Sequence, residues 1–104
     1  MSVARAVLVA VPTFRRAELL PELIEAIRRE AAAIALPTRV LLVDNDPDRS
    51  AEAPAAALGV EHLHEPVPGI AATRQAALDA AADHELVVMI DDDLVPEPGW
   101  LAGL

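Results

Sequence analysis

The chain has 104 residues, enough for one small domain, and it contains no cysteine, which excludes a disulfide framework and cysteine-ligated metal. Eight arginines and no lysine face 17 acidic residues, giving a net charge of −9, which argues against nucleic acid or an anionic membrane as a partner. No apolar run approaches the roughly 20 residues of a transmembrane segment, and we expect a cytoplasmic protein.

The first half of the chain predicts two strands around one long helix. Residues Ala6–Val11 are apolar and rich in valine, which is typical of a strand buried on both faces of a parallel sheet. Helical spacing of apolar residues follows over Glu18–Ala35, with Pro21 in the first turn, where a missing N–H is tolerated. The second apolar strand, Val40–Val43, ends in the turn-forming residues Asp44–Pro47.

The second half continues the alternation. Residues Ser50–Leu58 predict a short helix that Gly59 ends. Residues Val60–His64 predict a less apolar strand nearer an edge of the sheet. An alanine-rich helix over Ile70–Ala82 and a fully apolar strand over Leu86–Ile90 complete the pattern.

Regular alternation of strands and helices predicts an α/β fold, a three-layer α-β-α Rossmann-like arrangement with a mainly parallel sheet. Right-handed crossovers leave few topologies, of which the strand order 3-2-1-4 is the simplest. We treat residues 1–104 as a single domain. Such sheets bind ligands at the carboxyl ends of their strands, so the polar residues that follow each strand are the first candidates for a site.

Three aspartates, Asp91, Asp92 and Asp93, directly follow the fourth predicted strand. Carboxylates this close raise one another's pKa unless a positive charge neutralises them. A hard divalent cation such as Mg²⁺ or Mn²⁺ does so, usually with substrate phosphates completing its ligands. A solvated acidic turn that caps the next helix explains the triplet equally well on its own, and only the position at a strand end favours metal.

Other candidates also have two explanations. Asp44 could accept hydrogen bonds from a base or ribose, but turn statistics favour an Asx turn that shapes the loop. Arg74 could pair with a phosphate, and an arginine that is solvated or paired with an acid is the commoner case. Phe14 could stack on a base or, more commonly, pack in the core. The histidines show no ligand spacing, and neither G-x-G-x-x-G nor a P-loop is present.

Four segments together resemble the amino-terminal half of the family 2 glycosyltransferases, which have the GT-A fold. They are Val11-Pro12-Thr13-Phe14-Arg15-Arg16, Leu42-Val43-Asp44-Asn45, Gly69–Leu78, and Ile90–Asp93 followed by Pro98–Leu101. The resemblance covers essentially the whole chain. The sequences of these segments are most similar to those of bacterial exopolysaccharide glucosyltransferases of the succinoglycan type. The sequence departs from the family at Gln75, where asparagine is usual, and at Leu94, where many members carry an acid.

This resemblance implies a role for each matching residue. The residues implied to bind the nucleotide-sugar are Pro12, Thr13, Phe14, Arg16, Asp44, Arg74, Asp91 and Asp92. Among them, Thr13 and Phe14 would lie near the uracil and Asp44 would hydrogen-bond the base. Asp91 and Asp93 would form a D-x-D pair, in which Asp93, with Asp91, binds the Mn²⁺ or Mg²⁺ that bridges the diphosphate.

The activity implied is inverting transfer of a hexose from a UDP-sugar to a glycan or lipid-linked acceptor in polysaccharide biosynthesis. Family members take the catalytic base and the acceptor site from the part that follows the D-x-D segment. We therefore expect the base beyond Leu104, a sheet truncated after its fourth strand, and an isolated chain that is inactive. The parent would work in the cytoplasm or at the inner face of the membrane. The alternative is a non-catalytic nucleotide- or metal-binding module, or a degenerate remnant.

Overall fold

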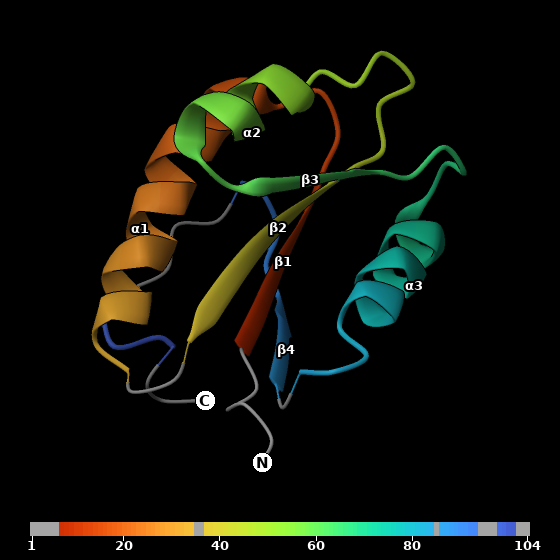
Figure 1. The fold of residues 1–104 in the computed structure, drawn as a ribbon. Helices are drawn as coiled ribbons and strands as arrows, with labels where there is room; N and C mark the ends of the chain where they lie inside the picture. Colours follow the sequence, from red (N-terminus) through yellow and green to blue (C-terminus); the bar gives the residue numbers. More distant parts are fainter. Residues whose placement is uncertain (1–6, 35–36, 85, 94–97, 102–104) are drawn as a thin grey trace.

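The computed structural model describes residues 7–34, 37–84, 86–93 and 98–101 (Figure 1). Its elements in chain order are β1 (Val7–Thr13), the 3₁₀ turn η1 (Ala17–Leu19), α1 (Leu20–Ala32), β2 (Thr38–Asp44), α2 (Glu52–Leu58), β3 (Glu61–His64), α3 (Ile70–Ala80) and β4 (Leu86–Met89). The predicted alternation is confirmed, and Pro21 lies in the first turn of α1 as expected. Gly59 ends α2 in the left-handed conformation at φ 73°, which a residue without a side chain adopts freely.

The sheet has the strand order β3-β2-β1-β4 and every pair is parallel, as predicted. Helices α1 and α2 cover one face, and α3 covers the other (Figure 1). The three-layer α/β arrangement is therefore confirmed. Along β1 the side chains alternate between the two faces. Val7, Val9 and Val11 pack in the core cluster with α1, and Leu8 and Ala10 pack in the cluster with α3.

β1 has neighbours of unequal length on its two sides. It pairs with β2 along its whole length, from Val7 to Thr13, but with β4 only as far as Ala10. The amide of Ile90 donates the last bond of that ladder, to the carbonyl of Ala10 at 3.1 Å. Residues 8, 10 and 12 of β1 turn their backbone groups toward β4, so the next donor would be residue 12. This residue is Pro12, which has no N–H, so the pairing with β4 stops there. The strand itself continues to Thr13 beside β2, and the expectation that it ends at Val11 is wrong.

A buried glutamate on α1 holds the segment that follows the acidic triplet. Glu30 is 4% exposed, and its carboxylate accepts the backbone N–H groups of Gly99 and Leu101, both at 3.1 Å. Leu101 is buried and Trp100 packs against the same core cluster. The turn that contains residues 98–101 is thus hydrogen-bonded to α1 and packs on the core cluster between α1 and the sheet.

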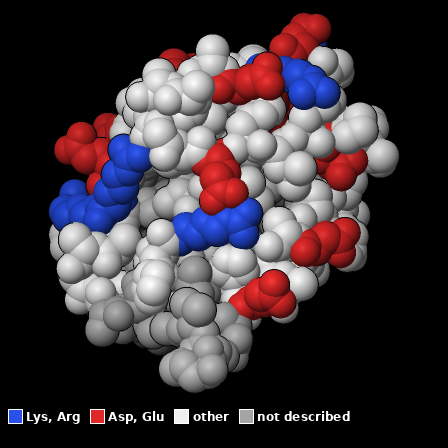
Figure 2. Space-filling model, viewed as in Figure 1, with Lys and Arg blue, Asp and Glu red and all other residues white. Residues whose placement is uncertain are grey.

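Charged side chains are spread over the surface. On the face seen in Figure 2, acidic groups are scattered and arginines lie beside them, so this face carries no separate basic patch. Among the described residues, no helix combines the length and the apolar character needed to cross a bilayer.

The burial of the core predicts that two leucines on helices differ greatly in their contribution to the free energy of unfolding. Leu23 on α1 is 1% exposed and Leu78 on α3 is 51% exposed. We expect Leu23→Ala to lower the free energy of unfolding by about 2–5 kcal/mol, because it leaves a cavity, and Leu78→Ala to lower it by less than about 1 kcal/mol. Urea denaturation followed by circular dichroism measures both. Equal losses in the two variants would contradict this assignment of the core.

Candidate functional site

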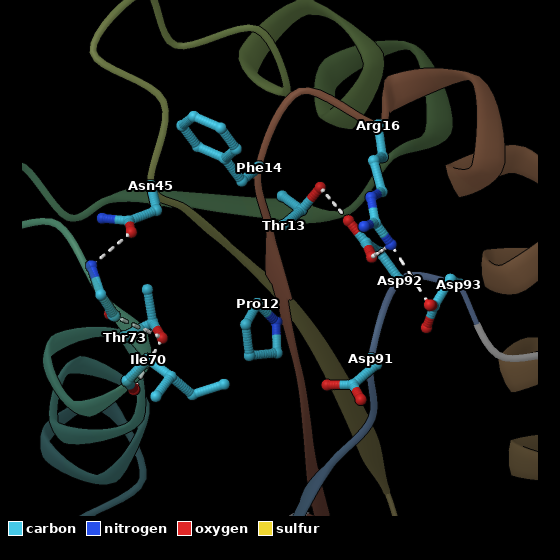
Figure 3. Close-up of a pocket in the computed structure, with 11 residues that line it drawn as sticks. Pro12, Thr13, Phe14, Arg16, Asn45, Ile70, Thr73, Asp91, Asp92 and Asp93 are labelled. Atoms are coloured by element: carbon cyan, nitrogen blue, oxygen red, sulfur yellow. Dashed lines mark hydrogen bonds and ion pairs between the residues drawn. The ribbon is translucent and has the colours of Figure 1, made fainter.

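An open pocket lies where β1, β4 and α3 meet at the carboxyl edge of the sheet (Figure 3). Its volume is about 400 Å³. The lining residues are Pro12, Thr13, Phe14, Arg16, Asn45, Gly69, Ile70, Thr73, Asp91, Asp92 and Asp93. Seven of the sequence-predicted site residues therefore come together here, all except Asp44 and Arg74. The early end of the β4 ladder makes room for the pocket, because the acidic triplet leaves β1 at Pro12.

Asp92 is the buried member of the acidic triplet, at 7% exposure. The hydroxyl of Thr13 donates to its Oδ2 atom at 3.0 Å, across the gap between the ends of β1 and β4. The Nη1 atom of Arg16 lies 3.4 Å from Asp92 Oδ1 and 3.2 Å from Asp93 Oδ2. Asp92 is thus held by a hydroxyl and a guanidinium, and the same guanidinium reaches the exposed Asp93.

Asp91 and Asp93 are the members of the triplet that solvent reaches. Asp91 makes no hydrogen bond or ion pair with another described residue, and Figure 3 shows its carboxylate without a partner. Within the described part of the chain, no group of three or more acidic or histidine side chains gathers closely enough to hold a metal. The donors that are present, two exposed carboxylates on either side of a neutralised one, fit a cation that takes its remaining ligands from a phosphorylated substrate. They do not form a closed metal cage.

Phe14 departs from the core packing that is commoner for phenylalanine, whereas Arg74 matches the solvated arginine that was its structural alternative. Phe14 is 50% exposed on the pocket wall, so core packing is wrong for this ring. The guanidinium of Arg15 lies over the ring, 5.1 Å from its centre. Arg74 is exposed on α3, outside the pocket lining, and forms no ion pair with any residue that the structure describes. Its proposed phosphate contact stays a prediction.

Asp44 is fully buried and is not among the residues that line the pocket. Its carboxylate accepts the N–H groups of Asp46 at 3.0 Å and Ala51 at 2.9 Å, and His62 Nε2 lies 2.9 Å from Oδ2. The bond to the residue two positions later is that of an Asx turn. The structure therefore gives Asp44 the loop-shaping geometry that turn statistics favoured, and its contact with a base stays a prediction.

Asn45 is a pocket residue that the sequence analysis did not single out. Its side-chain amide donates to the carbonyls of Glu65 at 2.8 Å and Val67 at 2.9 Å, and its Oδ1 accepts the N–H of Gly69 at 3.0 Å. Gly69 has φ 113°, a conformation that favours glycine. Asn45 thereby fixes the loop that leads into α3, and with it the pocket wall that contains Ile70 and Thr73. The signals in the sequence were its place in the turn after β2 and its place at the end of the segment Leu42–Asn45.

The loop after β2 is held by a second buried carboxylate, that of Asp46, which is 1% exposed. Hydrogen bonds from the Ser50 hydroxyl and the Asp48 backbone N–H, together with the Arg15 guanidinium, lower the pKa of Asp46 to about 2, although burial opposes this shift. Arg15 Nε lies 3.1 Å from Asp46 Oδ1. Arg15 itself has a positive φ of 54°. The carboxylate therefore ties the residues after β1 to the loop after β2.

Comparison with known proteins gives a family and a structural neighbour. A family model described as glycosyl transferase family 2 matches residues 8–104. No functionally curated protein matched the sequence. Among solved structures, the chain is similar to glucosyl-3-phosphoglycerate synthase from Mycobacterium tuberculosis, crystallised with Mn²⁺, uridine diphosphate and glucosyl-3-phosphoglycerate, with a TM-score of 0.69 and 20% identity. The match covers 94% of this chain and 37% of the synthase chain, and at this identity it establishes the shared fold.

The pKa of Asp46 predicts a stability loss in acid. A carboxyl whose folded-state pKa lies below its ordinary value stabilises the fold at neutral pH, and this contribution disappears as the pH falls from about 4 to about 2. We expect Asp46→Asn to unfold at lower urea than the wild type at about pH 7, and the difference to shrink toward about pH 2.5. Asp83→Asn, at an exposed position, is the control. A constant difference between wild type and Asp46→Asn over this range would contradict the prediction.

Proposed function

This chain belongs to glycosyl transferase family 2, and on that premise we propose that its pocket binds the UDP-sugar donor of a hexosyl transfer. The observation that carries the proposal is the meeting, in one pocket of about 400 Å³, of a half-exposed aromatic wall with an acidic triplet and an arginine. An aromatic face suits a base, and carboxylates that recruit a cation suit a diphosphate. The structural neighbour was crystallised with uridine diphosphate and Mn²⁺, which supports the same donor chemistry here.

Asp91 and Asp93 are the residues that would hold a divalent cation, Mn²⁺ or Mg²⁺, because they are the exposed carboxylates of the triplet. When bound, the cation would neutralise the charge that develops on the leaving diphosphate as the sugar C1–O bond breaks. Asp92, anchored by Thr13, orients the triplet and offers its remaining acceptor capacity to the ribose. Phe14 provides the surface on which the uracil stacks, with Pro12 and Thr13 beside it.

The base-binding role proposed for Asp44 requires the loop around it to open, because its carboxylate is fully buried and already has three partners. Asn45 already lines the pocket, so a base reaches its side chain more directly. Arg74 lies free on the first turns of α3 and would approach the nucleotide by rotation of its side chain.

For the whole protein we propose inverting transfer of the hexose to a glycan or lipid-linked acceptor, in exopolysaccharide synthesis of the succinoglycan type. The support for this acceptor class is the amino-acid sequence of the four segments that resemble the family. This chain spans little more than a third of the length of its structural neighbour. The catalytic base is accordingly proposed to come from sequence outside these residues, and the 104 residues alone are proposed to bind donor without turnover.

Metal-dependent nucleotide binding tests the donor site directly. We expect isothermal titration calorimetry to detect UDP binding in the presence of Mn²⁺ and to lose it when EDTA is added. Asp91→Asn and Asp93→Asn keep the side-chain shape and remove one charge each, and we expect each to weaken UDP binding by roughly tenfold or more, or ~1.4 kcal/mol.

The matched control for these variants is Asp83→Asn, an exposed aspartate before β4 that does not line the pocket, which should bind like the wild type. Circular dichroism establishes that each protein is folded. Failure of the folded wild type to bind UDP with Mn²⁺ would reject the donor site. Binding that survives both substitutions would reject the acidic triplet as its metal-holding part.

A further inference from the structure

We propose that Arg16 couples the binding of the cation to that of the diphosphate, by occupying Asp93 until both ligands arrive together. This inference rests on the donor site proposed above and assigns Arg16 a positioning role there. Without ligands, the guanidinium is the counter-ion of two carboxylates of the triplet. With ligands, a divalent cation replaces it at Asp93, and Arg16 turns to the phosphate charge.

The geometry places a single nitrogen between the two acids. Arg16 Nη1 lies 3.4 Å from Asp92 Oδ1 and 3.2 Å from Asp93 Oδ2 (Figure 3). A cation bound to the same oxygen of Asp93 would lie beside the positive guanidinium, and two like charges at that separation repel one another. The guanidinium and the cation therefore compete for Asp93.

The competition is an equilibrium that a ligand can shift. The side chains of Arg16 and Asp93 are 50% and 54% exposed, and an exposed ion pair of this kind is weak. Asp92 is instead buried and fixed by the Thr13 hydroxyl at 3.0 Å, so Arg16 keeps one partner when it leaves Asp93. The side chain can change its position at Asp93 without leaving a buried charge unpaired.

The local charge favours binding of the cation and the diphosphate together. Three carboxylates and one guanidinium carry −3 + 1 = −2, the charge that one divalent cation balances. A cation that arrives alone meets a site in which Arg16 already neutralises part of this charge. A diphosphate adds oxygen ligands for the cation and negative charge for Arg16, which lines the same pocket. Cation and diphosphate therefore strengthen each other's binding, and this coupling is reciprocal.

Calorimetric titration of Mn²⁺ without and with saturating UDP measures the coupling in the wild type and in Arg16→Gln. We expect the variant to bind Mn²⁺ alone about three- to tenfold more tightly than the wild type, because the competing charge is gone. The factor by which UDP strengthens Mn²⁺ binding should shrink by a similar amount. Arg16→Lys keeps the charge and should stay closer to the wild type. Arg29→Gln is the matched control, because Arg29 is a 55% exposed arginine on the last turn of α1, and it should change neither affinity.

If Arg16→Gln binds Mn²⁺ alone no more tightly than the wild type, while the wild type binds Mn²⁺ with UDP, the coupling is wrong and the donor site stands. If the wild type does not bind UDP with Mn²⁺, both fall. If circular dichroism shows that Arg16→Gln is unfolded, the proposal is tested by the NMR signal of the Arg16 Nε–H group in the wild type. This signal is assigned by its absence from the spectrum of Arg16→Lys. Mg²⁺ with UDP should shift this signal more than Mg²⁺ alone, and an unchanged signal overturns the proposal.

Discussion

The site depends on one missing hydrogen-bond donor in the central strand. The even-numbered residues of β1 turn their backbone groups toward β4, and Ala10 accepts the last bond of that ladder. The next even position is Pro12, which has no N–H to offer, whereas the pairing with β2 continues through Thr13. The two neighbours of β1 therefore separate at this point. The acidic triplet leaves the sheet while Thr13 is still fixed within it, and the pocket lies between them.

The acids at this edge of the sheet divide into two kinds. Asp44, Asp46 and Asp92 are buried, and each accepts hydrogen bonds from backbone N–H groups or from a hydroxyl, so their charge organises loops. Asp91 and Asp93 are exposed, and their charge faces the pocket. A strongly acidic chain can thus gather carboxylates at one edge of its sheet, because the buried ones are each stabilised by hydrogen-bond donors of the protein. The exposed pair, with Arg16 beside Asp93, leaves negative charge at the pocket for a cation.

Local pattern predicted the fold well and the polar contacts poorly. Apolar runs, helical spacing, Pro21 and Gly59 each act over a few residues, and with right-handed crossovers they were sufficient for the strand order β3-β2-β1-β4. Seven of the site residues that the resemblance implied lie in one pocket of the structure, and their roles there remain predictions. The contacts that were missed join distant positions: Asn45 with Gly69 across 24 residues, and Glu30 with Gly99 across 69. Such bonds follow no period, and nothing near Asp92 in the sequence distinguishes it as the buried aspartate of three.

The attachment of residues 98–101 to Glu30 has a consequence for how this protein can be recombined. The two backbone N–H groups at Gly99 and Leu101 are satisfied by one side chain that lies on the first helix of the chain. A chimera whose first helix comes from another protein and lacks this glutamate would leave both N–H groups without their acceptor, and the one at Leu101 is buried. Module boundaries drawn along the sequence would therefore fail here. The helix that precedes β2 and the turn that follows β4 are separated in the chain but have to be exchanged as one unit.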